Sequence, residues 1–262
     1  MTQHNNWLLN VNEHIAKLTL NRPAEMNNLN VETLHELREI ATYLSTQSDI
    51  WVIILEGNGS HFSSGVDLDI FQERIDRAKD ELFDFIRDQQ RCLDAFAALE
   101  KVTIAKIHGF CLGGGLILAV CCDFRIASTR TIFSLPEVKL GIPILWGTQR
   151  VVRIVGVQQA KEMIMLGKRY RAEEALKIGL VNQIVSPQDL DNAVASLAAR
   201  FTHLPPRTVG VNKRIIDQGF SLPLEQSEVL ELEAFENILD SPDIKEAIDS
   251  YTTKREPHYT GK

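Results

Sequence analysis

Three consecutive glycines, Gly113–Gly115, lie between two apolar segments and form the stretch of this sequence best suited to chemistry. The preceding run, Thr103–Ile107, is typical of a buried strand, and the following run, Leu116–Cys122, is typical of a helix buried on all sides. Glycines at a strand-to-helix turn let a ligand approach the backbone, where the free N–H groups of the helix favour negative charge. The turn could hold a phosphate, hold an oxyanion formed during a reaction, or serve packing alone.

The residues after the glycines argue against two common phosphate-binding motifs. A P-loop requires Lys and then Ser or Thr at positions that are Leu116 and Ile117 here. The G-x-G-x-x-G pattern of dinucleotide-binding turns is absent as well. An oxyanion is therefore the better candidate ligand, and such a site usually needs a second donor from another part of the chain.

A second glycine turn has the same arrangement between a strand and a helix. Gly65 lies in the middle of the segment HFSSGVDL at residues 61–68, which follows the continuous apolar run Trp51–Leu55. That run is typical of a buried parallel strand. After the turn we expect a long helical region from about Ile70 to Glu100, because its apolar residues, beginning with Phe71, recur at helical spacing.

Composition and charge limit the class of protein. The chain has 262 residues, of which 44% are hydrophobic and 24% charged, so it predicts a globular protein with one large domain or one domain and an appendage. A net charge of −7 disfavours nucleic-acid binding, and no stretch approaches the ~20 apolar residues of a membrane span. The N-terminal residues are polar and the four cysteines lack metal-ligand spacing, so we expect a cytoplasmic protein without a metal.

The elements that must position the two turns alternate between strand and helix. Residues 7–12 and 15–20 predict a hairpin, and Asn30 is suited to cap a helix over Val31–Ser45. This alternation continues to about residue 190 and indicates an α/β fold. The remainder, from about Thr208 to Lys262, predicts charge-rich helices that cover the main domain or a partner subunit.

Six short motifs occur in the order and spacing of the crotonase superfamily, the enoyl-CoA hydratase/isomerase family. The chain resembles this family from about Trp7 to its C-terminus through NRPxxxNxL (residues 21–29), FxSGxDL (62–68), GxxLGGG (109–115), CD (122–123), PEVxLGIP (136–143) and GTQR (147–150). The resemblance implies a crotonase-like spiral of stacked β-β-α units over residues 1–200. It also implies a C-terminal helical segment, residues 201–262, that assembles a homotrimer or a dimer of trimers.

The resemblance further implies an acyl-CoA substrate and no other cofactor. In this family two backbone N–H groups hold the thioester oxygen, and motif position assigns these catalytic donors to Val66 and Gly114. A backbone donor does not depend on its side chain, so valine at position 66 is compatible with the role. The family often has a Lys where this chain has Ala24. Contacts with CoA are implied at Glu25, Met26, Ser64, Gly65, Asp67, Leu68 and Gly113.

The family's hydratases use two glutamates, and this chain retains one. Glu137 stands in the Pro-Glu motif, whereas the position of the other glutamate is Ile117. One carboxylate can carry one proton between two carbons, which is the task of a Δ3,Δ2-enoyl-CoA isomerase. Bulky Ile144, Leu145 and Trp146 replace small residues beside the water site, where they should exclude water and raise the pKa of Glu137.

Two alternatives to the isomerase stay open. The chain could be a hydratase, hydrolase or decarboxylase in which another polar group replaces the missing glutamate; polar residues near the motifs are His61, Ser64, His108 and Ser134. It could also be an acyl-CoA-binding oligomer without activity. Lys254 and Arg255 are candidate contacts for a CoA phosphate, and neither nucleic acid nor a membrane is an expected partner.

Overall fold

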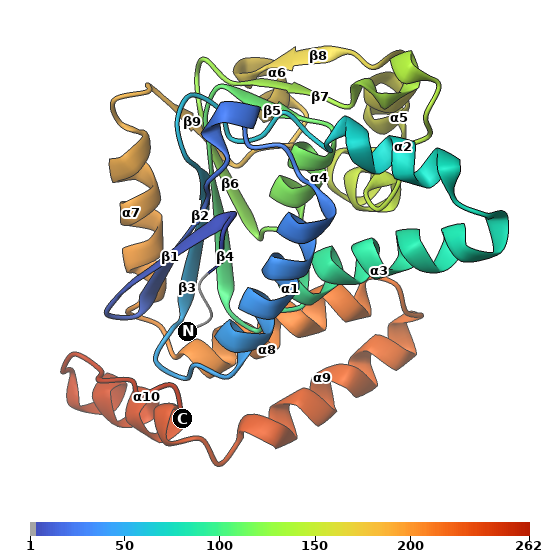
Figure 1. Ribbon diagram of the computed structural model, residues 1–262. Helices are drawn as coiled ribbons and strands as arrows, with labels where there is room; N and C mark the ends of the chain where they lie inside the picture. Colours follow the sequence, from blue (N-terminus) through green and yellow to red (C-terminus); the bar gives the residue numbers. More distant parts are fainter. Residues whose placement is uncertain (1–3) are drawn as a thin grey trace.

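Two sheets form successive layers of the molecule (Figure 1). The computed structural model describes residues 4–262, apart from the side chains of Phe71, Glu73 and Asp76. The large sheet has, in spatial order, β1 (Trp7–Asn12), β2 (Ile15–Leu20), β3 (Val52–Gly57), β4 (Val102–Ile107), β6 (Phe124–Ser128) and β9 (Gln183–Val185). The small sheet has β5 (Phe110–Leu112), β7 (Ile132–Ser134) and β8 (Arg169–Arg171). The pairs β1–β2 and β7–β8 are antiparallel, and the other ladders are parallel.

Helices cover both faces of the large sheet. In Figure 1, α7 lies on one face, α1 and α3 lie on the other, and the C-terminal helices lie below. The helices are α1 (Val31–Ser45), α2 (Leu68–Asp76), α3 (Lys79–Ala97), α4 (Gly114–Val120), α5 (Thr148–Leu166), α6 (Ala172–Lys177), α7 (Leu190–Phe201), α8 (Pro206–Gly219), α9 (Leu224–Ile238) and α10 (Pro242–Thr253). Two short 3₁₀ helices, η1 (Pro23–Glu25) and η2 (Pro136–Leu140), precede α1 and α5.

Burial on both faces explains why the central strands read as continuous apolar runs. Along β4, Ile104 packs in a cluster with Leu190 and Val194 of α7, whereas Ala105 and Ile107 belong to the main core on the opposite face. Successive side chains of a strand point to opposite faces, so each of these faces needs its own apolar residues. The predicted strand Thr103–Ile107 is thereby confirmed, with Val102 added at its start.

The N-terminal elements follow their local sequence signals. Strands β1 and β2 pair as the predicted hairpin, with Trp7 opposite Leu20. The side chain of Asn30 accepts a hydrogen bond from the Thr33 N–H at 2.8 Å, which caps α1 as expected. The apolar stripe of α1 is buried against the main core, and its members are Leu34, Leu37, Ile40, Ala41 and Leu44.

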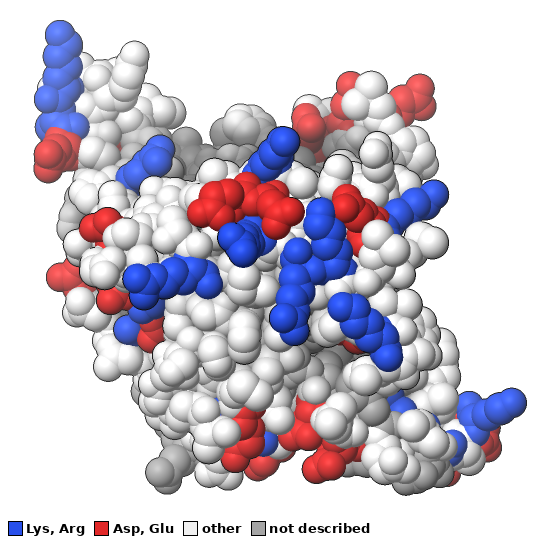
Figure 2. Space-filling model, turned by 90° about the horizontal axis from the view of Figure 1, so that it is seen from above, with Lys and Arg blue, Asp and Glu red and all other residues white. Residues whose placement is uncertain are grey.

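The small sheet is extended by loops that follow strands of the large sheet. Ser63 forms a parallel bridge with Cys111 of β5, and Leu29 forms another with Val66. Strands β3, β4 and β6 are therefore each followed by a segment in the second layer, which confirms the expected β-β-α spiral. Figure 2, viewed from above Figure 1, shows Lys and Arg side chains interspersed with Asp and Glu on this side of the molecule.

Two helical predictions need correction. The expected helix from Ile70 to Glu100 is two helices, because Arg77 and Ala78 are extended between α2 and α3, and acidic residues in the first turn of α3 favour a new start there. The chain after Lys254 is not helical. Its last residues fold back, and the N–H groups of Thr260 and Gly261 donate to the buried Asp243 carboxylate, each at 2.8 Å.

Phe71 was predicted to belong to an apolar stripe, but its side chain is not among those that the structure describes. Over residues 4–262, none of the helices combines the length and the apolar character that crossing a membrane requires.

Candidate active site

The turn at Gly65 leaves one N–H group facing away from its own ladder. The Leu29 N–H donates to Gly65 O at 2.8 Å and the Asp67 N–H donates to Leu29 O at 2.9 Å, so the N–H of the intervening Val66 points to the opposite side. Gly65 has φ +114°, a conformation that other residues rarely adopt. The Gly65 N–H donates to Ser63 Oγ at 3.2 Å, which holds the turn in place.

The turn at Gly113–Gly115 also presents a free N–H group. The Gly113 N–H donates to Ser134 O of β7 at 2.9 Å, and Gly113 O accepts the first hydrogen bond of α4, from Ile117. Gly114 begins α4, so its N–H has no partner within the helix. Gly113 has φ +49°, and the whole of α4 is buried, as the sequence predicted for this segment.

The two turns converge on one place. A Cβ atom built on Gly114 would lie 3.4 Å from Val66 N and 2.5 Å from Val66 Cγ2, and one built on Gly65 would lie 3.5 Å from Gly114 N. No side chain larger than hydrogen fits at Gly114 without displacing Val66. The N–H groups of Val66 and Gly114 are thus neighbours that could donate to the same oxygen atom.

Glu137 brings a carboxylate to this pair of turns. It lies in the first turn of η2, directly after the small-sheet strand β7, and its Oε1 lies 2.8 Å from where a Cβ of Gly113 would be. Its Oε2 is buried and makes no hydrogen bond to the described part of the chain. Burial raises the pKa of the Glu137 carboxyl above its ordinary value, which suits a group that must take up and release a proton.

An apolar side chain occupies the place of the second glutamate. Ile117 is buried in α4, and its Cδ1 lies 1.9 Å from the position of a Cβ on Gly147, so it packs directly against that glycine's backbone. Ile144 and Trp146 of the same loop also pack against the main core. The Trp146 indole N–H donates to Ile86 O of α3 at 3.2 Å, which fixes the loop to the helix.

The residues predicted to contact CoA lie on neighbouring loops. Met26 and Ser64 are joined by a hydrogen bond from the Ser64 N–H to Met26 O at 2.9 Å. Met26 and Leu68 have exposed side chains, whereas Asp67 caps α2 and lies 3.7 Å from the Arg22 guanidinium. The structure thus brings together the loop around Glu25 and Met26, the turn Ser64–Leu68 and Gly113; their contact with CoA stays a prediction.

Three of the four alternative polar residues make side-chain contacts with backbone groups. The His61 ring accepts from the Phe110 N–H at 3.2 Å, a His108 ring nitrogen lies 2.9 Å from Gly59 O, and the Ser134 hydroxyl donates to Lys168 O at 3.0 Å. None of these contacts involves Glu137.

The two candidate contacts for a CoA phosphate near the C-terminus differ in whether they pair with carboxylates of their own chain. Arg255 pairs with Glu246 at 2.5 Å and with Asp249 at 2.6 Å. Lys254 is an exposed C-cap of α10. Of the two residues, Arg255 is the one already committed to carboxylates of its own chain.

Two positioning residues were missed by sequence reasoning. Ser63, fully buried, both accepts from Gly65 and lies so close to Gly115 that a Cβ there would meet its Oγ at 2.6 Å. The buried Asn27 side chain donates to Asn58 O and His61 O, each at 2.7 Å. Both residues lie inside recognised motifs, so motif membership was the available signal, but it did not indicate which atoms they hold.

The fold and the two converging amides agree with the architecture expected for the crotonase superfamily. A family model for enoyl-CoA hydratase/isomerase matches residues 10–262. Among similar proteins, the short-chain-enoyl-CoA hydratase of Clostridium acetobutylicum is 35% identical over 96% of each chain. The peroxisomal Delta(3,5)-Delta(2,4)-dienoyl-CoA isomerase of Arabidopsis thaliana is 32% identical over 95% of this chain and 94% of its own. The chain belongs to the enoyl-CoA hydratase/isomerase family.

A solved structure supports the same assignment of the fold. The crystal structure of an enoyl-CoA hydratase from Bacillus anthracis superposes with a TM-score of 0.90 at 31% identity, covering 98% of this chain and 100% of that one. The similarity extends through the C-terminal helices, so the expected crotonase-like architecture is confirmed over nearly the whole chain.

Proposed function

We propose that this protein is a Δ3,Δ2-enoyl-CoA isomerase in which Glu137 is the single acid and base. The observation that carries the proposal is the pairing of one carboxylate beside Gly113 with a buried isoleucine at the position of the hydratases' other glutamate. Moving one proton between two carbons requires one such group, whereas adding water requires an anchored water as well as a proton donor.

The reaction follows from the placement of the donors. The thioester oxygen of a 3-enoyl-CoA accepts hydrogen bonds from the N–H groups of Val66 and Gly114. Glu137 removes a proton from the α carbon, the resulting dienolate is held by the two amides, and the same carboxyl returns the proton to the γ carbon. The double bond moves from C3–C4 to C2–C3, and no group other than the CoA of the substrate is needed.

The apolar residues on the proton-transfer side support retention of the proton by Glu137 between the two steps. Ile117 packs against the backbone of Gly147, Trp146 packs against the main core, and the buried Oε2 of Glu137 limits exchange of its proton with solvent. A carboxyl that keeps its proton between the two steps transfers it from the α to the γ carbon of one molecule. An α-deuterated substrate is therefore expected to give product with deuterium at the γ carbon.

The experiment is an ultraviolet assay of conjugation with a 3-enoyl-CoA, combined with mass analysis of the deuterium label. Turnover by the parent protein, label at the γ carbon and loss of turnover in Glu137→Gln support the isomerase. Absence of turnover over a panel of chain lengths, or turnover unchanged in Glu137→Gln, overturns it. Tight binding of acyl-CoA without turnover would favour the inactive binding protein instead.

A hydratase is the second candidate, and the names of relatives such as the Clostridium acetobutylicum enzyme favour it. Incorporation of heavy oxygen from labelled water into product separates hydration from isomerisation. We expect no incorporation in the parent protein. Ile117→Glu restores the second carboxylate and is expected to introduce incorporation, whereas the size-matched Ile117→Met control is not.

We also propose that residues 201–262 mediate assembly into a homotrimer or a dimer of trimers. In Figure 1, α9 lies away from the two-sheet body. Large apolar side chains of this segment are exposed by more than half, among them Ile216, Phe220, Leu224, Leu232 and Phe235. Such surface usually marks a protein interface.

Light scattering tests the assembly. The parent protein should have three or six times the mass of one chain, and Leu232→Asp should lower the measured mass. A monomeric parent contradicts the proposal.

A further inference from the structure

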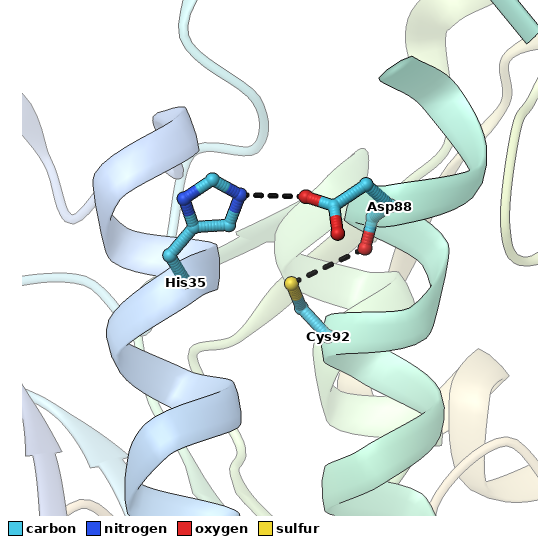
Figure 3. Close-up of side chains that lie close together, drawn as sticks. All are labelled: His35, Asp88 and Cys92. Carbon is cyan, nitrogen blue, oxygen red and sulfur yellow. Dashed lines mark hydrogen bonds and ion pairs between the residues drawn. The ribbon is translucent and has the colours of Figure 1, made fainter. Parts of the chain in front are cut away.

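Three side chains with metal-binding atoms meet where α1 packs against α3, as Figure 3 shows. His35 comes from α1, and Asp88 and Cys92 lie one turn apart on α3. One ring nitrogen, one carboxylate oxygen and the thiol sulfur all lie within 4.8 Å of one another. The His35 Nε2 atom lies 2.7 Å from Asp88 Oδ2, and Cys92 Sγ lies 3.3 Å from Asp88 O.

We propose that His35, Asp88 and Cys92 form a binding site for a divalent transition metal, best suited to Zn²⁺. Imidazole nitrogen, carboxylate oxygen and thiolate sulfur are the three ligand types that zinc uses in proteins. Residues four apart on one helix, facing a third ligand on a neighbouring helix, present their atoms to a common point. The site lies in the helical layer and does not depend on the proposed reaction.

The three ligand atoms lie within 4.8 Å of one another, so each pair is at most about 1.5 Å from the spacing that a tetrahedral metal requires. With metal–ligand distances of about 2.0–2.3 Å, ligand atoms of a tetrahedral zinc site are roughly 3.3–3.6 Å apart. The nitrogen and oxygen at 2.7 Å must separate by less than 1 Å, which a small rotation of two half-exposed side chains provides. The sulfur must lose the proton that its thiol donates to Asp88 O, and that proton passes to solvent on binding.

The surroundings supply an outer contact and an open position. Arg38 donates from Nη1 to Asp88 Oδ1 at 2.7 Å, which leaves Oδ2 directed toward His35. A second group holding the far oxygen of a ligating carboxylate is a common feature of metal sites. The side chains of His35 and Asp88 are 41% and 39% exposed, so a water molecule can reach the fourth position, whereas Cys92 closes the site from inside.

The charges of the cluster favour a dication over a monocation. A bound Zn²⁺ would meet two negative ligands, the Asp88 carboxylate and the Cys92 thiolate, and Arg38 would add one positive charge nearby. That positive charge weakens binding relative to a site without it. We therefore expect a moderate affinity that depends on the thiolate, rather than the very tight binding of a four-ligand structural site.

The test uses the full chain and Co²⁺ as a spectroscopic probe for zinc. Cobalt bound by the cluster is expected to give a sulfur-to-metal charge-transfer band in the near ultraviolet that saturates at one equivalent and is displaced by Zn²⁺. Cys92→Ser should abolish the band. His35→Gln, at a half-exposed position, should weaken Co²⁺ binding at least about 10-fold. Cys121→Ala, which removes a thiol elsewhere, should keep the parent affinity.

Two results overturn the proposal. No band at a large excess of Co²⁺, or a band that persists in Cys92→Ser, means that the three side chains form an ion pair and a helix contact only. Circular dichroism of His35→Gln verifies that weakened binding reflects the lost ligand and not unfolding. An acyl-CoA assay plays no part, so failure here is distinguishable from failure of the isomerase.

Discussion

The two sides of the candidate active site are built from different groups, one from backbone amides and the other from side chains. The oxyanion side consists of the backbone amides of Val66 and Gly114, held by ladder hydrogen bonds, and a larger residue at Gly114 would clash with Val66. The proton-transfer side consists of side chains, with Glu137 on a short 3₁₀ turn and Ile117 in a buried helix. The first side can stay the same while the second changes by single substitutions, so the oxyanion side predicts the family and the other side predicts the reaction.

The largest effect should come from the side-chain half. Glu137→Gln keeps the shape of the side chain but cannot exchange a proton, so kcat for 3-enoyl-CoA isomerisation should fall by about 10²–10⁴. Acyl-CoA affinity, measured by calorimetry with a saturated analogue, should change little because the amides remain. A variant that keeps most of its kcat would mean that the proton passes through another group.

A matched pair of variants at Gly114 tests the backbone half. Gly114→Ala and Gly114→Pro both add a Cβ that would lie 2.5 Å from Val66 Cγ2, but only the proline removes the N–H. The Val66→Ala background relieves this clash. In that background we expect Gly114→Pro to lie about 10²–10³ below Gly114→Ala in kcat, the range for loss of one oxyanion donor. Equal rates for the two would remove the Gly114 amide from the mechanism.

A smaller effect should follow from the residue that joins the two turns. Ser63→Ala removes the acceptor of the Gly65 N–H, a hydrogen bond worth about 0.5–1.5 kcal/mol, so kcat should fall roughly 2- to 10-fold. The KM should change less than kcat, because the lost hydrogen bond orients the Val66 amide, which acts on the charge that develops on the thioester oxygen during the reaction. The exposed Ser60→Ala serves as the control in the same loop. A change confined to KM would contradict a positioning role.

The smallest expected effect is on thermal stability. Its dependence on pH should differ between a variant on the proton-transfer side and a variant on the oxyanion side. Burial raises the pKa of Glu137 in the folded state, so between the unfolded pKa and the folded pKa the native state binds more protons. The contribution of this group to stability is therefore complete at low pH and is lost as pH rises through the folded pKa. The Tm of Glu137→Gln relative to the parent should rise with pH, whereas that of Gly114→Ala should not; a pH-independent difference would argue against the raised pKa.

Local signals in the sequence account for much of the fold. The cap at Asn30, the hairpin and the apolar runs of the central strands were predicted correctly because each depends on neighbouring residues. The break between α2 and α3 was not predicted, since Arg77 and Ala78 carry no strong helix-breaking signal and their extended conformation is a matter of tertiary packing. The same limit applies to β8, a three-residue strand that depends on pairing with β7.

The sequence by itself determined the family, the two glycine turns and the loss of one glutamate, because these are properties of residue type and order. Only the tertiary structure placed Val66 N beside Gly114, brought Glu137 to Gly113, and joined His35 to Asp88 and Cys92 across two helices. The physical reason is that distances between residues far apart in the chain are set by packing and strand register. Spacing along the sequence does not encode those distances.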